Sequence, residues 1–103
     1  MVTIKKINSL DEYKSMIKGC AVIKFSAVWC APCRFLAETI KGLDTTVPFG
    51  EIDVDDEFAD AITADLNIRG IPVLIFFKDG KEVSRTVGAV PVDKIIENLK
   101  GLE

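Results

Sequence analysis

The side chains best suited to chemistry are two cysteines separated by two residues, in the segment Cys30-Ala31-Pro32-Cys33. The segment follows an apolar stretch typical of a buried strand and precedes residues with helical spacing. A helix N-terminus has unpaired N–H groups and a positive dipole end, and both stabilise a thiolate. We therefore expect Cys30 to be an exposed nucleophile. Cys33, one turn into the helix, should be shielded, close enough to Cys30 to form a disulfide, and able to act as the resolving thiol.

The composition of the 103-residue chain limits which other chemistry is available. There is no histidine, which excludes Ser-His and Cys-His hydrolases and most catalytic zinc sites. With 13 Lys and Arg against 16 Asp and Glu, the net charge is −3, and no basic block indicates a nucleic-acid partner. The length and a hydrophobic share of 49% suit one domain over residues 1–103.

The remaining cysteine and the apolar segments bear on location. Cys20 is interpreted as a packing residue at the entry to a strand, because free cysteine packs well and no partner is close in sequence. The N-terminal residues lack the apolar core of a signal peptide, and the longest apolar run, residues 71–77, falls far short of the roughly 20 residues of a membrane helix. We therefore expect a cytoplasmic protein with no membrane segment.

Two alternating hydrophobic periods predict strands and helices in turn. Helices are predicted after Ser9, from near Cys30, around residues 58–66 and from Pro91. Strands are predicted at residues 2–7, 21–26, 47–55, 72–77 and 82–87. The order βαβαβαββα places parallel strands first and an antiparallel hairpin last, an α/β class.

Local signals support this division. Ser9 and Glu12 have the spacing of a capping box, and Asp79-Gly80 suits the two-residue turn of a hairpin. In the helix that starts near Cys30, the residues expected to face inward are Phe35, Ile40 and Leu43.

Read together, these segments resemble the thioredoxin family over essentially the whole chain. Residues 29–33, Trp-Cys-Ala-Pro-Cys, are similar to the family's W-C-G-P-C site, and residues 69–72, Arg-Gly-Ile-Pro, to its R-G-I-P segment. Residues 87–89 are similar to its third active-site loop and residues 77–81 to its hairpin. The resemblance implies a thioredoxin fold, with a five-stranded mixed sheet in strand order 1-3-2-4-5 flanked by four helices.

The resemblance also implies a site and a reaction. Ile71-Pro72 should be a cis peptide beside the cysteines, and the residues expected to bind an extended target are Trp29, Ala31, Pro32, Ile71, Pro72 and Gly88. The implied reaction is thiol–disulfide exchange with disulfide-containing target proteins by a monomer. A thioredoxin reductase that carries the flavin would recycle the chain, which itself needs no bound cofactor.

The chain departs from the family at several positions. Lys24 stands where the family usually has a buried Asp, and Glu51 aligns with the usual Lys partner. A buried lysine is costly unless paired, which favours a Lys24–Glu51 ion pair, although Lys24 could instead reach solvent at the strand end. We hypothesise that Lys24 stabilises thiolates while Glu51 or water accepts the proton of Cys33. Ser26 replaces a second Trp, and Glu38 replaces a kink-forming Pro.

Three alternatives remain open. A C-x-x-C pair also begins metal sites, but one pair supplies only two of the four ligands usually needed. The chain could act as a disulfide isomerase or oxidase, or as a non-catalytic interaction module with the same fold.

Overall fold

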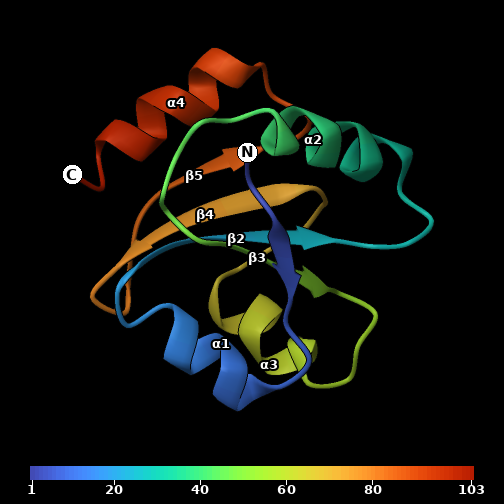
Figure 1. The fold of residues 1–103 in the computed structure, drawn as a ribbon. Coiled ribbons are helices and arrows are strands. Elements are labelled where there is room, and N and C mark those ends of the chain that lie inside the picture. The colour runs from blue at the N-terminus through green and yellow to red at the C-terminus, as the bar shows by residue number, and fades with distance from the viewer.

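The computed structural model describes all 103 residues and contains five strands and four helices in the predicted order (Figure 1). The strands are β1 (Ile4–Lys6), β2 (Cys20–Ser26), β3 (Phe49–Asp53), β4 (Val73–Lys78) and β5 (Lys81–Val87). The helices are α1 (Leu10–Met16), α2 (Ala31–Lys41), α3 (Ala59–Asp65) and α4 (Val92–Lys100). The predicted order of elements is therefore confirmed.

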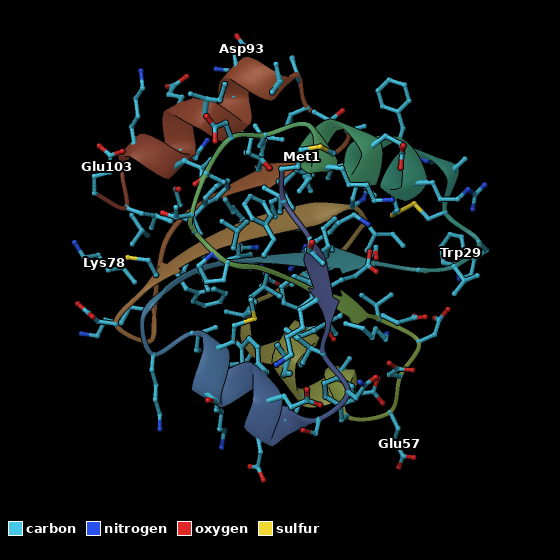
Figure 2. All side chains as sticks on the ribbon, in the orientation of Figure 1. Met1, Trp29, Glu57, Lys78, Asp93 and Glu103 are labelled. Atoms are coloured by element: carbon cyan, nitrogen blue, oxygen red, sulfur yellow. A yellow bond between two sulfur atoms is a disulfide. The ribbon has the colours of Figure 1, made fainter.

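The strands form one mixed sheet in the order β1-β3-β2-β4-β5. β3 pairs in parallel with β1 and β2, whereas β4 runs antiparallel to β2 and β5. Helices α2 and α4 cover one face of the sheet, and α1 and α3 cover the other (Figure 1). Side chains fill the space on both sides (Figure 2), which is why the central strand β2 is buried along almost its whole length.

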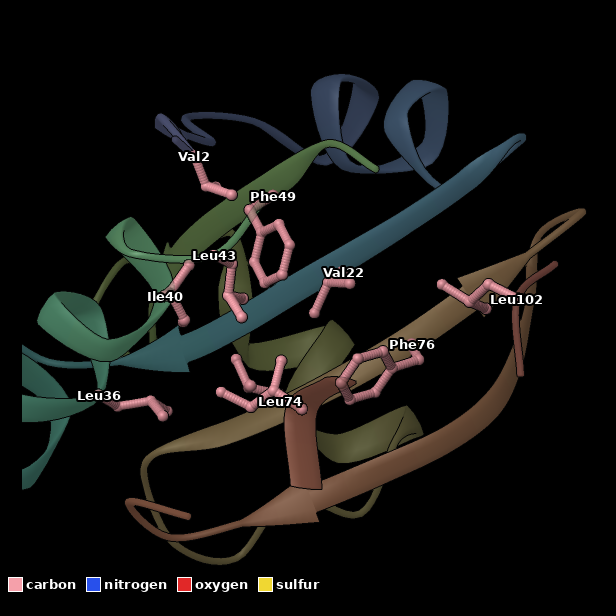
Figure 3. Close-up of a cluster of buried hydrophobic side chains, with 10 residues drawn as sticks. Val2, Val22, Leu36, Ile40, Leu43, Phe49, Leu74, Phe76 and Leu102 are labelled. Atoms are coloured by element: carbon pink, nitrogen blue, oxygen red, sulfur yellow. The ribbon is translucent and has the colours of Figure 1, made fainter. Parts of the chain in front are cut away.

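Each face of the sheet carries its own apolar cluster. The cluster beneath α2 and α4 contains Val22, Leu36, Phe49 and Phe76 among its members (Figure 3). The cluster on the other face includes Phe25, which lies next to Lys24 along β2. Because neighbouring residues of a strand point to opposite faces, this alternation places Val22, Lys24 and Ser26 on the α2 side.

The predicted inner face of α2 is wrong at one position. Phe35 is 70% exposed, whereas Leu36 is fully buried and packs in the same cluster as Ile40 and Leu43. The buried residues of the helix, Cys33, Leu36 and Ile40, follow one another in steps of three and four. Phe35 lies about 100° around the helix from Leu36 and therefore faces solvent.

Strand lengths and local signals refine the other predictions. β1 and β3 are shorter than predicted, because β1 lies at the sheet edge and pairs with β3 over only Ile4 to Lys6. Ser9 Oγ accepts a hydrogen bond from the Glu12 N–H at 3.1 Å, which is one half of the predicted capping box. In the other half the prediction is off by one residue, because Glu12 Oε1 accepts from the Asn8 N–H and not from the Ser9 N–H. Both Asp79 (φ 55°) and Gly80 (φ 82°) have positive φ, as the predicted hairpin turn demands.

Candidate active site

Cys30 and Cys33 form a disulfide at the N-terminus of α2. Cys30 is the N-cap residue, and its Sγ accepts a hydrogen bond from the Cys33 N–H at 3.2 Å. Pro32 fits in the first turn because the helix has no hydrogen bond to lose there. The helix therefore directs unpaired N–H groups and the positive end of its dipole toward the sulfur atoms.

The expected exposure of Cys30 is wrong for this disulfide form. Cys30 is only 5% exposed and Cys33 only 1%. The cause is packing, because Ala27 from the preceding loop and Val54 and Ile71 from distant segments contact the pair. Cys30 is nevertheless the less buried residue of the two, which agrees with its expected role as the first to meet a target.

A second segment meets the disulfide from the start of β4. Ile71-Pro72 is a cis peptide, as expected, and Ile71 packs against the cysteines. Antiparallel pairing of Phe25 with Val73 places the end of β2 beside the beginning of β4. Gly88 lies next to this segment, since its N–H donates to the Pro72 carbonyl at 2.8 Å, and its φ of 88° suits glycine.

Trp29 projects from the loop between β2 and α2 and is 69% exposed (Figure 2). Its indole N–H donates to Asp55 Oδ2 at 2.8 Å. A groove of about 250 Å³ lies next to Trp29 and is lined also by Ile68, Arg69 and Ile71. Sequence reasoning missed Asp55, although its place just after β3, a parallel neighbour of β2, indicated the same edge of the sheet.

Lys24 and Glu51 form the expected ion pair beneath the site. They are register partners on β2 and β3, and Lys24 Nζ donates to Glu51 Oε2 at 2.5 Å. Lys24 is 2% exposed and Glu51 32%, so the alternative in which Lys24 reaches solvent is wrong. Ser26 Oγ donates to the same Oε2 at 2.9 Å.

The ion pair shares a cavity with the resolving cysteine. The cavity has a volume of about 390 Å³, and its walls include Lys24, Ser26, Cys33 and Glu51. Burial alone raises the pKa of Glu51, but the hydrogen bond and charge of Lys24 and the hydrogen bond from Ser26 outweigh this effect. The pKa of Glu51 therefore lies below its ordinary value, and its carboxylate is ionised at neutral pH.

Comparison with known proteins agrees with this geometry. The thioredoxin family model matches residues 4–101. The chain belongs to the thioredoxin family. It is 38% identical over 95 residues to a thioredoxin of Chlamydia caviae, an alignment that covers 88% of this chain and 91% of that one. It is 39% identical over 90 residues to thioredoxin H-type 1 of Nicotiana tabacum, covering 82% of this chain and 70% of that one.

Solved structures give the same fold. The crystal structure of a thioredoxin from Malassezia sympodialis superposes with a TM-score of 0.85 at 30% identity, covering 100% of this chain and 94% of that one. The family and the disulfide together make this chain a thiol–disulfide oxidoreductase that acts as a thioredoxin-type reductase. Members of the family carry no bound cofactor of their own. None of the helices is long and apolar enough to cross a bilayer.

The structure brings most of the predicted site residues to one end of the sheet and leaves one cysteine away from it. Ala31 and Pro32 are exposed in the first turn of α2, beside Cys30. Cys20 begins β2, at the end of the strand opposite Ser26. Its Sγ donates to the Leu102 carbonyl at 3.5 Å, and it packs on an apolar cluster, as the packing interpretation expects.

Proposed function

We propose that this chain reduces protein disulfides with Cys30 as the nucleophile and Cys33 as the resolving thiol. The observation that carries the proposal is the Cys30–Cys33 disulfide at the N-terminus of α2, with Ile71 packed against it. The helix terminus supplies a positive field for a thiolate without any neighbouring base, which suits a chain without histidine.

The reaction proceeds in two exchanges. The Cys30 thiolate attacks one sulfur of the target disulfide, forms a mixed disulfide and expels the other target sulfur as a thiolate, which takes up a proton. Cys33 then loses its proton and attacks Cys30 Sγ. This step forms the Cys30–Cys33 bond and breaks the bond to the target, so that two electrons have passed to the target as two thiols.

Target binding is assigned to Trp29, Ala31, Pro32, Ile71, Pro72 and Gly88. Support comes from the main chain of Ile71, whose N–H and C=O take part in no hydrogen bond within the molecule. An extended target segment could pair with these two groups as an added strand would. Trp29 and the groove beside it would then contact the target's side chains.

Lys24 and Glu51 are proposed to tune the site and handle its proton. Lys24 contributes a buried positive charge, which favours the thiolates over the disulfide. Glu51 is ionised and lines the same cavity as Cys33, so it can accept the Cys33 proton through water.

Membership of the family supports a proposal for the cellular setting of the chain. We propose that residues 1–103 work as one domain and as a monomer in the cytoplasm. A flavin-containing thioredoxin reductase would return the Cys30–Cys33 disulfide to the dithiol, and the flavin would stay on that partner.

The test is reduction of insulin in the presence of a purified thioredoxin reductase and its electron donor. Cys30→Ser should abolish the activity, and Cys33→Ser should accumulate a mixed disulfide between Cys30 and insulin. Cys20→Ser is the matched control and should behave like the wild type. Insulin reduction that survives Cys30→Ser would overturn the proposal.

A further inference from the structure

The carboxylate of Glu51 lies where two grooves meet. The first is the cavity beneath the disulfide, which Cys33 also lines. The second, of about 470 Å³, lies between the N-terminal residues 1–4 and α2. Only Glu51 and Ala37 line both grooves. Glu51 is also partly open to solvent, whereas its partner Lys24 is not.

The two oxygens of Glu51 have different surroundings. Oε2 accepts hydrogen bonds from both Lys24 Nζ and Ser26 Oγ. Oε1 accepts none from the protein. The two donors fix the orientation of the carboxylate and leave Oε1 available to water, which is the arrangement required of a group that must accept a proton and then release it.

We propose that the proton released by Cys33 leaves the molecule through Glu51 and the groove along residues 1–4, and that Ala37 keeps this passage open. The proposal rests on the proposed function, in which Glu51 accepts the proton. In the second exchange, the proton passes from Cys33 Sγ through water to Oε1, and Cys33 Sγ attacks Cys30 Sγ. The proton then passes from Oε1 to water in the second groove, which regenerates the carboxylate before the next turnover.

The charges around the passage favour the second step, in which Glu51 releases the proton to water. Besides Glu51, the charged side chains that line the two grooves are Lys6, Lys24, Arg34, Lys41 and Asp53. Of these, Lys6 is paired with Asp56 and Lys41 with Glu38, so neither closes the passage by bonding to Glu51. Cations predominate, and positive charge lowers the affinity of Glu51 for a proton, so the carboxyl group releases its proton readily.

Ala37 is the position at which the passage can be blocked. It lies on α2, one turn after Cys33, and its methyl group borders both grooves. Ala37→Leu would place a bulky apolar side chain at the junction and exclude water there. Ala37→Ser keeps the side chain small and should leave the passage open. Ala61→Leu makes the same substitution at an exposed position of α3 that lines neither groove.

The experiment follows the mixed disulfide by rapid mixing of the reduced protein with a disulfide-containing peptide, acid quenching and mass spectrometry. Formation of the mixed disulfide reports attack by Cys30, and its decay reports attack by Cys33. For Ala37→Leu we expect normal formation of the mixed disulfide and a decay about tenfold slower. This factor is smaller than the rate contribution typical of a positioned acid–base group, because the acceptor itself is still present. Ala37→Ser and Ala61→Leu should match the wild type in both phases.

Glu51→Gln separates this inference from the proposal on which it rests. Slow decay in Glu51→Gln with normal decay in Ala37→Leu would overturn the passage and leave Glu51 as acceptor. Normal decay in both variants would overturn both. An Ala37→Leu protein that slows formation and decay equally would indicate a structural effect and would also overturn the passage. If Ala37→Leu does not fold, Thr3→Phe narrows the same groove from its exposed wall and must slow the decay selectively.

Discussion

Lys24 and Glu51 face each other across β2 and β3 with the cation buried and the carboxylate half-buried. Relative to the order that the family resemblance leads us to expect, the two charges are exchanged between the strands. Positive rather than negative charge lies on the strand that leads to Cys30, and the carboxylate sits on the strand nearer the sheet edge. Several consequences of this exchange can be measured.

The exchanged pair should set the reduction potential. A buried cation near the sulfurs stabilises thiolates, so the wild type should be more oxidising than Lys24→Asp. Each 1.4 kcal/mol of preference corresponds to about 30 mV, and a difference of that order is expected in equilibrium with glutathione. Lys24→Asp/Glu51→Lys is the matched control, since it restores the family's order without placing two carboxylates side by side, and it should also be more reducing. Equal potentials for the wild type and both variants would contradict the role given to Lys24.

The two members of the pair should contribute unequally to stability. Glu51→Ala leaves a cation that is 2% exposed without a partner, and removal of one partner of a buried pair costs about 3–5 kcal/mol. Lys24→Met leaves a carboxylate that can still reach water, so it should cost clearly less. Urea unfolding at neutral pH measures both. A larger loss of unfolding free energy in Lys24→Met than in Glu51→Ala would contradict the finding that Lys24 is the more buried member of the pair.

The free energy of unfolding should fall in acid because Glu51 becomes protonated. Because the folded protein holds the pKa of Glu51 below its ordinary value of 4.5, the folded state favours the ionised form. The contribution is fully present above pH 4.5 and is lost as the pH falls through the lowered value in the folded state. Unfolding free energies measured from pH 6 down to the acid transition should therefore decline less steeply in Glu51→Gln than in the wild type. Parallel curves would exclude this contribution.

The free energy of unfolding should also fall in alkaline conditions, because Tyr13 loses its proton. Burial, with Asp65 and Glu82 nearby, raises the pKa of Tyr13 to about 12 from 10.0. The folded state therefore holds the proton more tightly, and the stability present below pH 10 is lost as the pH rises toward about 12. Tyr13→Phe keeps the edge-to-face packing on Phe77 and should flatten the decline over this interval. A decline as steep as that of the wild type would show that other groups cause it.

The bond from Trp29 to Asp55 should position the indole for targets. Asp55→Ala removes the acceptor, and loss of about 1 kcal/mol from one such bond should lower kcat/KM for a protein disulfide about fivefold. The reduction potential should not change. Since Trp29 is the sole tryptophan, its fluorescence reports the change directly. Asp55→Asn retains an acceptor and should stay near the wild type, and a loss of activity equal to that of Asp55→Ala would point to the charge instead.

The features that depend on neighbouring residues could be predicted from the sequence. The cap at Ser9, the turn at Asp79-Gly80 and the start of α2 at the cysteines all depend on nearby residues. The exposure of Phe35 could not be read from apolar spacing, because two adjacent apolar residues, Phe35 and Leu36, both fit a helical face until the sheet is in place.

Features that depend on contacts between distant segments were harder to predict. The burial of Cys30 depends on Val54 and Ile71, which the fold brings from other strands and loops. Asp55 has no motif of its own, and its role follows only from its contact with Trp29. The Lys24–Glu51 pair was predictable because a buried cation requires a partner and the resemblance to the family pointed to Glu51.

The antiparallel pairing of β2 with β4 has a consequence for how the molecule can be divided. Phe25 and Val73 are pairing partners at the end of the sheet nearest the disulfide, although almost half the chain separates them in sequence. A fragment that stops before Val73 would keep Cys30 and Cys33 but would lack the strand that holds Ile71-Pro72 beside them. Two complementary fragments, each inert alone, should regain disulfide reduction only when they reassemble. The protein could therefore be split in the loop before β4 to make a reporter in which exchange activity signals that two fused partners have met.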